Sequence, residues 1–351
     1  MDDNDLLTLV LGMLDPTAKS RDGLSRNGRL LLAMPSQREA FSKALRLYQP
    51  QRPAAQWMTS ALRLLAFTGI HKCLLKKIKT DVHRLELDPR LDGLEADSCG
   101  ILLGSPEHKN RRAIASFRRN ESWEVAKIAP STEGADALES ESDILIELGS
   151  RTPGVPAMLG FHRCGKAALL RMPYLTGVPI SPSNSTPALD LLKSWISSSL
   201  PIAANEFPEW PAIESALHRL QRGPELLALL SSEKLHPTIR HGDFARWNLL
   251  AQPDGSLVVL DWEWGHSHGM PGLDMVHYFL QDYRLVHRCL PQESIRQTIT
   301  RFHRSDAVEI LAHSGWRGHP LLTIIASLAF KQGAAHQDNQ EMLKAAIAQF
   351  P

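Results

Sequence analysis

Hydrophobic residues in the first ninety positions follow a helical pattern. Five of them recur at three- and four-residue spacing: Leu6, Leu7, Val10, Leu11 and Leu14. Further helices are predicted over residues 36–48 and 55–79, with prolines between them. We therefore expect residues 1–92 to form a helical N-terminal extension, which is a candidate surface for a protein partner. Its basic end, at 76–79, suits an acidic partner, a membrane surface or simply a solvated helix face.

From residue 96 the pattern changes to short alternating or β-branched runs. Strands are predicted at Cys99–Leu103, Ala113–Arg118 and Trp123–Ile128, separated by turn-forming residues. A helix over Gly134–Leu148 follows, and then another apolar run at Ala167–Met172. A small antiparallel sheet, one helix and a linker therefore predict a compact lobe over 93–177.

The remaining residues, 178–351, read as a mostly helical lobe. Helices are predicted at 188–199, 212–220, 225–233, 295–302, 307–313 and 321–330. One hairpin interrupts them, because the turn Pro253-Asp254-Gly255 stands between two apolar runs. The expected fold class is α+β.

The hairpin carries the chain's most distinctive polar residues. Asp243 and Asn248 lie in HGDFARWN (241–248), and Asp261 closes the apolar run 257–260. Their oxygen-bearing side chains suit Mg²⁺, a hard cation that shares its ligand shell with phosphates. Phosphoryl transfer needs chiefly a positioned nucleophile and positive charge on the phosphate oxygens. Asp243 is therefore a candidate to accept the proton of an attacking hydroxyl or to orient it, with Asn248 and Asp261 as metal ligands.

HGDFARWN followed by VVLDWEWG resembles the paired motifs of the aminoglycoside phosphotransferase and choline kinase superfamily, relatives of protein kinases. The resemblance implies a bilobal protein-kinase-like fold and an enzyme that transfers phosphate from ATP to a hydroxyl of a small molecule. It implies that Asp243 is the catalytic aspartate and that Asn248 and Asp261 bind Mg²⁺. The side chains do not distinguish ATP from GTP.

Such a lobe also carries a strand lysine for the nucleotide phosphates and a helix carboxylate that positions it. Lys127 stands on the third predicted strand of the lobe, with Glu141 as the preferred partner and Glu139 as its rival. The linker at Met172 and Tyr174 falls where the nucleotide base would meet backbone groups. These assignments follow from the resemblance.

The loop at 104–110 is where the family covers phosphate, yet it has one glycine and no GxGxxG pattern. Backbone amides of Gly104 and Ser105 are candidates for phosphate contact, and a plain hairpin loop explains the sequence equally well. If the loop does not cover phosphate, a non-catalytic pseudokinase becomes the alternative, as a nucleotide sensor or protein-interaction module.

Other polar residues near the hairpin have open interpretations. His266 and His268 form an HxH pair that fits either a transition metal or a solvated loop. Asp274 is expected to anchor a loop or cap a helix. Arg246 fits the transferred phosphate or the loop's own backbone. Side chains alternate between the two faces of a strand, so Glu263 is expected near the metal site with Asp261. Trp262 and Trp264 would then point the other way and are expected to pack against the protein interior.

The composition limits the classes of partner and the cellular location that the sequence suggests. Lys and Arg total 39 against 38 Asp and Glu, a net charge of +1, which gives no general attraction to nucleic acid. The four cysteines show no metal-ligand spacing. The acidic N-terminus is unlike a signal peptide, and no apolar run is long enough to span a bilayer, so we expect a cytoplasmic protein. A sugar, aminoglycoside, amino alcohol or nucleoside-like acceptor fits equally, since the glutamates 206, 209, 214 and 225 of a possible acidic pocket are scattered.

Overall fold

The computed structural model describes most of the chain and divides it into two compact units. The described residues are 2–14, 20–26, 29–35, 37–48, 53–68, 75–79, 98–105, 111–181, 184–331 and 337–351. The first unit comprises Met1–Ile146 and Ala157–Leu175, and the second comprises Glu147–Pro156 and Thr176–Pro351. The described residues before 92 therefore belong to the same unit as the predicted small lobe.

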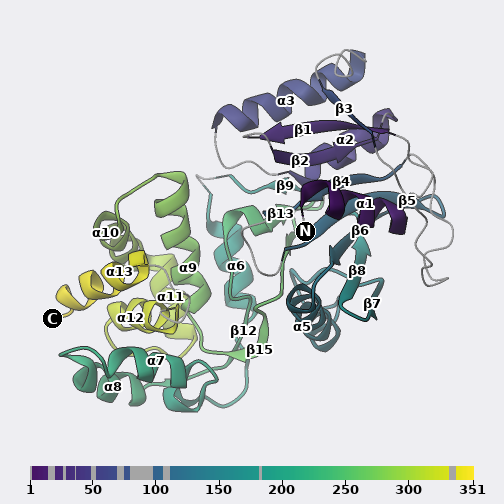
Figure 1. Ribbon diagram of the computed structural model, residues 1–351. Helices are drawn as coiled ribbons and strands as arrows, with labels where there is room; N and C mark the ends of the chain where they lie inside the picture. Colours follow the sequence, from purple (N-terminus) through teal and green to yellow (C-terminus); the bar gives the residue numbers. More distant parts are fainter. Residues whose placement is uncertain are drawn as a thin grey trace. The chain divides into compact units, whose positions relative to one another are not determined.

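The first unit is built on an antiparallel sheet of eight strands in the order β3-β1-β2-β4-β5-β6-β8-β7 (Figure 1). The strands are β1 (Ser20–Arg26), β2 (Arg29–Met34), β3 (Lys76–Lys79), β4 (Gly100–Leu103), β5 (Ala113–Arg119), β6 (Ser122–Ala129), β7 (Gly160–Cys164) and β8 (Ala167–Pro173). The three strands predicted from the sequence are confirmed as β4, β5 and β6, each to within about two residues, and the apolar run at Ala167–Met172 forms β8.

Helices cover both faces of this sheet. They are α1 (Asp3–Leu14), α2 (Arg38–Leu47), α3 (Pro53–Thr68) and α5 (Thr132–Leu148). The predicted apolar face of α1 is confirmed, because its leucines and valine are buried in one core cluster with Ile101, Phe117 and Ile128 of the sheet. On the opposite face, Phe41 and Leu45 of α2 form a second cluster with residues of β2. The alternation of side chains along β2 supplies both clusters.

The N-terminal extension differs from the expectation of a helical segment, because it also contributes three strands. Residues 76–79, predicted as the end of a helix over 55–79, form β3, which pairs with β1 through Arg21 opposite Ile78. The pairing of β2 with β4, which sets Leu32 opposite Leu102, joins the extension to the rest of the sheet. Segments as polar as Ser20–Arg26 carry no apolar period, and their strand structure depends on long-range pairing rather than on local pattern.

The second unit is mostly helical, and the α+β class is thereby confirmed. Its helices are α6 (Thr186–Ser194), α7 (Trp210–Leu217), α8 (Gly223–Ser231), α9 (Leu273–Gln281), α10 (Pro291–Phe302), α11 (Ser305–His313), α12 (Pro320–Phe330) and α13 (Gln337–Ala348). All six predicted helices are present, although α6 ends at Ser194 rather than Ser199. Helix α12 is buried on every side over 321–329, as its nearly uninterrupted apolar sequence requires.

Short strands frame the polar motifs. β12 (Thr238–Arg240) pairs with β15 (His266–Gly269), and β13 (Leu249–Ala251) pairs with β14 (Leu257–Val259) and with β9 (Val178–Pro179). The hairpin predicted around Pro253-Asp254-Gly255 is thus confirmed. Residues 241–248 connect β12 to β13, and Asp261 lies between β14 and β15. The pairings β12–β15 and β13–β14 therefore hold the ends of both polar segments.

The remaining short elements are β10 (Ile202–Ala203), β11 (Lys234–Leu235) and single turns η2 (Ala204–Glu206), η3 (Arg246–Asn248) and η4 (Asp282–Val286), the last of them π-helical. Within the described part of the chain, no helix combines the length and the apolar character needed to cross a membrane.

Candidate active site

The loop that carries HGDFARWN is held by the carboxylate of Asp274, the second residue of α9. This carboxylate accepts the backbone N–H of His241 at 2.5 Å and that of Gly242 at 2.9 Å. The expectation that Asp274 anchors a loop is therefore confirmed. Two bonds to one carboxylate fix the start of the loop relative to α9.

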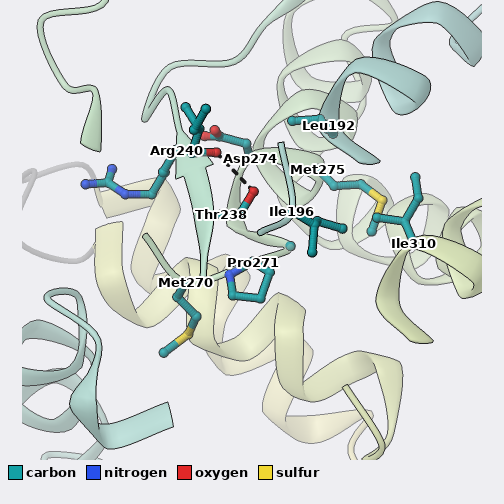
Figure 2. Close-up of a pocket in the computed structure, with 11 residues that line it drawn as sticks. Leu192, Ile196, Thr238, Arg240, Met270, Pro271, Asp274, Met275 and Ile310 are labelled. Carbon is teal, nitrogen blue, oxygen red and sulfur yellow. Dashed lines mark hydrogen bonds between the residues drawn. The ribbon is translucent and has the colours of Figure 1, made fainter. Parts of the chain in front are cut away.

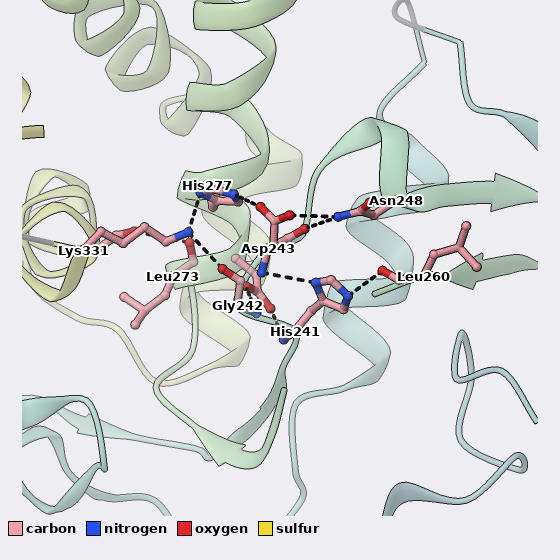
Figure 3. Close-up of polar contacts among 10 residues, drawn as sticks. His241, Gly242, Asp243, Asn248, Leu260, Leu273, His277 and Lys331 are labelled. Atoms are coloured by element: carbon pink, nitrogen blue, oxygen red, sulfur yellow. Dashed lines mark hydrogen bonds and ion pairs between the residues drawn. The ribbon is translucent and has the colours of Figure 1, made fainter. Parts of the chain in front are cut away.

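The buried ring of His241 connects the two motifs (Figure 3). Its Nδ1 accepts the N–H of Asp243 at 3.2 Å, and its Nε2 lies 2.9 Å from the carbonyl oxygen of Leu260. This network assigns the proton to Nε2. Burial holds the pKa of His241 below its usual value, although three nearby carboxylates oppose the shift, so the ring is neutral.

Both carboxylate oxygens of Asp243 are held by side chains of the second unit. Oδ1 lies 2.8 Å from Nε2 of His277, and Oδ2 accepts Nδ2 of Asn248 at 3.0 Å. Burial raises the pKa of this carboxyl, but the bond from His277 and the charge of Lys331 outweigh it, so the pKa lies below its usual value. The side chain is 37% exposed. Asp243 is therefore an oriented, ionised carboxylate that solvent can reach.

Asn248 and Asp261 have the chemistry and placement for a hard cation. Nδ2 of Asn248 also donates to the backbone oxygen of Asp243 at 2.9 Å, so its amide oxygen points away from that residue. The backbone oxygen of Asn248 accepts the N–H of Leu260 at 2.8 Å, which places it beside the residue before Asp261. Asp261 has a φ of +72°, a left-handed conformation that non-glycine residues adopt uncommonly and that recurs at functional sites.

This donor set fits Mg²⁺, which takes oxygen ligands and usually keeps waters and substrate phosphates in its shell. No three His, Cys, Asp or Glu side chains gather into a metal site among the residues that the structure describes. The pair Asn248 and Asp261 would therefore hold the ion together with ligands from outside the chain. Nδ1 of His266 accepts the N–H of His268 within β15, which leaves that ring bonded locally.

The sequence did not identify His277 and Lys331 as part of the site. Nζ of Lys331 lies 2.7 Å from Nδ1 of His277 and donates to the carbonyl oxygen of Gly242 at 2.9 Å (Figure 3). His277 follows Asp274 by three positions, a spacing that puts both on one helix face and was a usable signal. Lys331 directly follows the last residue of α12, and nothing in its sequence surroundings marks it.

In the first unit, Lys127 and Glu141 form a buried ion pair. Nζ of Lys127 on β6 lies 2.6 and 2.7 Å from the two carboxylate oxygens of Glu141 on α5. The rival, Glu139, bonds to Arg163 instead. The structure thus selects Glu141 as the partner, while the contact of Lys127 with nucleotide phosphates stays a prediction.

The predicted phosphate loop is only partly described, because residues 106–110 lie outside the described residues. The N–H of Gly104 donates to the carbonyl oxygen of Arg112 at 2.9 Å, and its own carbonyl oxygen accepts Nε of Arg111 at 3.0 Å. Because the amide of Gly104 is used within the hairpin, the expectation that it contacts phosphate is not supported by this geometry. Of the two predicted amides, that of Ser105 stays a prediction.

The linker residues lie at the end of β8. Met172 is buried opposite Val125 of β6. The hydroxyl of Tyr174 donates to the carbonyl oxygen of Lys43 at 3.0 Å, and Nζ of Lys43 lies 4.5 Å from the centre of the Tyr174 ring. Helix α2 of the N-terminal extension therefore contacts the predicted linker directly.

Other residues singled out in the sequence have structural partners. Arg246 forms an ion pair with Asp282, and its contact with the transferred phosphate stays a prediction. Trp262 is buried and its ring lies 4.8 Å from that of His241, which confirms packing. Trp264 is 61% exposed, so the expectation that it packs is wrong.

The glutamates considered for an acidic acceptor pocket do not gather. Glu209 is buried and accepts Nε of Arg240 at 2.5 Å, whereas Glu225 pairs with Arg222 on the surface. A small cavity behind the loop, of about 20 Å³, is lined mainly by apolar side chains such as Ile196, Met275 and Ile310 (Figure 2). That volume holds one water molecule and no acceptor.

Comparisons with known proteins find similar structures but no similar sequences. No family model matches the chain, and no curated protein matches it. Similar solved structures include a thermostable mutant of aminoglycoside phosphotransferase APH(4)-Ia with ADP and hygromycin B, at 13% identity and a TM-score of 0.46 over 71% of this chain and 92% of that one. They also include the ethanolamine kinase of Plasmodium vivax, at 12% identity and a TM-score of 0.46 over 75% and 83% of the two chains.

A third is the choline kinase LicA from Streptococcus pneumoniae, at 12% identity and a TM-score of 0.44 over 74% and 95% of the two chains. All three proteins are of the superfamily that the HGD and DWE motifs resemble.

Proposed function

We propose that this protein is an ATP- and Mg²⁺-dependent phosphotransferase that acts on a hydroxyl group of a small molecule. The observation that carries the proposal is the carboxylate of Asp243, held on one oxygen by His277 and on the other by Asn248 while it stays 37% exposed. A carboxylate that is fixed, ionised and accessible is suited to orient a hydroxyl and take its proton.

The acceptor oxygen forms a bond to the γ-phosphorus of ATP, and the bond from that phosphorus to the β,γ-bridging oxygen breaks, its electron pair leaving with ADP. The hydroxyl proton passes to Asp243 and then to solvent. Mg²⁺, when bound by Asn248 and Asp261, would neutralise charge on the phosphate oxygens. Lys127, positioned by Glu141, is assigned to the nucleotide phosphates.

Nucleotide binding is tested by thermal unfolding with and without Mg·ATP. Binding to the folded state raises the melting temperature, by mass action, in the wild type. Asp261→Ala is expected to lose most of this increase, because one of two protein ligands of the metal is removed. Asp254→Asn in the nearby exposed turn is the matched control and should keep it. No response of the wild type to Mg·ATP or Mg·GTP would contradict the proposal.

Transfer is tested by ADP release with a panel of sugars, aminoglycosides, amino alcohols and nucleosides. An acceptor should raise the rate above that with water, and Asp243→Asn should abolish the increase. Release that is the same in Asp243→Asn would remove Asp243 from the mechanism.

The second candidate is a nucleotide-sensing module without transferase activity. The amide of Gly104, which is committed to Arg112, favours it because one expected phosphate contact is then missing. The two experiments separate the candidates, since a sensor shows the Mg·ATP response in melting temperature but no acceptor-dependent ADP release.

A further inference from the structure

We propose that His277 and Lys331 are positioning residues for Asp243: Lys331 fixes the proton of His277 on Nε2, and this N–H holds the Asp243 carboxylate in the orientation that receives the acceptor hydroxyl. The inference rests on the proposed phosphotransfer and adds two residues to its site. Neither touches the reacting atoms, so both would act through Asp243.

Hydrogen-bond chemistry sets the direction of this chain of contacts. A lysine ammonium has three donors and no acceptor. Nζ of Lys331 lies 2.7 Å from Nδ1 of His277, so Nδ1 must accept, and Nε2 must then carry the proton in a neutral ring. Nε2 lies 2.8 Å from Oδ1 of Asp243, an acceptor. From Lys331 through His277 to Asp243, every donor therefore meets an acceptor only when His277 carries its proton on Nε2.

The same helix fixes the loop at two points. Asp274 and His277 stand one turn apart on α9, and the first holds the backbone of the loop while the second holds its carboxylate. Helix α12, which packs against α9, brings Lys331 to the carbonyl oxygen of Gly242. A side chain held from two helices keeps its orientation to within the narrow range that transfer requires.

The surrounding charges support a neutral His277 beside a charged Lys331. Burial and the charge of Lys331 lower the pKa of His277, although Asp243 and Asp274 oppose the shift. Burial lowers the pKa of Lys331 to about 8, with Arg240 acting in the same direction and Asp243 and Asp274 against it. A buried ammonium is costly. An apolar side chain could fill the same space after α12 without the cost of burying a charge.

The first experiment measures ADP release from Mg·ATP with water as the acceptor, which needs no identified substrate. His277→Phe and Lys331→Met keep the side-chain size but remove the contacts, and each is expected to lower kcat by about 10- to 100-fold. The KM for ATP should stay unchanged, because the contacts of the nucleotide are not altered. Lys193→Met, which removes an exposed ion pair with Glu309, is the matched control and should keep the wild-type kcat.

Conservative variants separate positioning from folding. The amide nitrogen of His277→Gln can donate from near the position of Nε2, so this variant should recover much of the kcat that His277→Phe loses. Lys331→Arg keeps the charge and donors and should also recover part of it. Equal losses in His277→Gln and His277→Phe would overturn the inference.

The second experiment observes His277 directly by the ¹⁵N NMR shifts of its ring in the full-length protein. The wild type should show a proton on Nε2 and none on Nδ1 between pH 6 and 7.5. In Lys331→Met the pKa of His277 should rise, because a neighbouring positive charge is gone. A wild-type ring protonated on Nδ1, or a His277 pKa that is the same in Lys331→Met, would overturn the inference.

The outcomes distinguish this inference from the function on which it rests. If the wild type releases ADP and binds Mg·ATP while His277→Phe keeps the wild-type kcat, only the positioning role falls. If the wild type neither binds Mg·ATP nor releases ADP with any acceptor, the proposed function falls and the positioning role falls with it.

Discussion

Nε2 of His241 lies 2.9 Å from the carbonyl oxygen of Leu260, and this contact joins the loop of Asp243 to the residue before Asp261. The N–H of Leu260 donates in turn to the backbone oxygen of Asn248. Leu260 is therefore held from both sides by the HGDFARWN loop. The proposed metal ligands and the proposed catalytic aspartate are linked by these two contacts to the backbone of Leu260.

Replacing His241 should loosen this connection. His241→Phe keeps the ring volume but leaves the buried Leu260 carbonyl and Asp243 N–H without the imidazole, so we expect a loss of about 1–3 kcal/mol in the free energy of unfolding. Urea unfolding measures it. His236→Phe removes an imidazole bonded to the Ser199 carbonyl at an exposed site and should cost less than about 0.5 kcal/mol. Equal losses in the two variants would contradict the role given to His241.

The two buried imidazoles should make stability depend on pH. Burial lowers the pKa of both His241 and His277 in the folded state. The unfolded histidines, with a pKa of about 6.5, therefore bind protons first as the pH falls. The two neutral rings therefore lower the free energy of unfolding only below about pH 6.5, where the unfolded state gains protons that the folded state does not bind. Urea unfolding between pH 5.5 and 7.5 should show the decrease, and His241→Phe should flatten it; an unchanged slope would argue against a buried neutral ring.

Replacing only one residue of the Lys127–Glu141 ion pair should destabilise the fold more than replacing both. Lys127→Met leaves the Glu141 carboxylate buried without its ammonium, so we expect a loss of about 3–5 kcal/mol in the free energy of unfolding. Lys127→Met/Glu141→Gln should lose less, because no charge is left behind. Arg163→Met, which breaks the exposed pairs with Asp136 and Glu139, is the control and should destabilise the protein far less than Lys127→Met. A double variant that is as unstable as the sum of its single variants would show that the two residues are not coupled.

Sequence patterns identified the elements whose structure is locally determined. Lys127 stands on a strand with clear alternation, and Glu141 on a helix with an apolar face, so both elements followed from local pattern, whereas the pairing of the two residues followed from the family resemblance. The hairpin around Gly255 followed from its turn residues. In each case the informative residues lie within about twenty positions of one another.

Contacts between distant segments could not be derived in this way. Lys331 meets His277 only because α12 packs against α9, and no spacing in the sequence encodes that approach. Strand β3 was read as helix for a similar reason, since its register with β1 decides its conformation. Long-range packing therefore supplies the part of the site that supports Asp243, whereas local motifs supply Asp243 itself.

Gly242 should be irreplaceable for a reason of space as well as conformation. Its φ of +84° is unfavourable for other residues, and a Cβ there would lie 2.6 Å from both the Cβ and the backbone oxygen of Trp264. Gly255 has a φ of +86° but nothing within 4 Å of an added Cβ, so it is a control matched in conformation alone. Gly255→Ala should cost about 1–2 kcal/mol in the free energy of unfolding.

Gly242→Ala should cost more than Gly255→Ala, because the loop must also shift away from the backbone of Trp264. That shift moves the neighbouring Asp243, so ADP release from Mg·ATP should fall in Gly242→Ala and stay at the wild-type level in Gly255→Ala. Urea unfolding and ADP release measure the two effects on the same preparations. Similar losses of stability in both variants, with unchanged ADP release in both, would show that the contact with Trp264 does not restrict the loop.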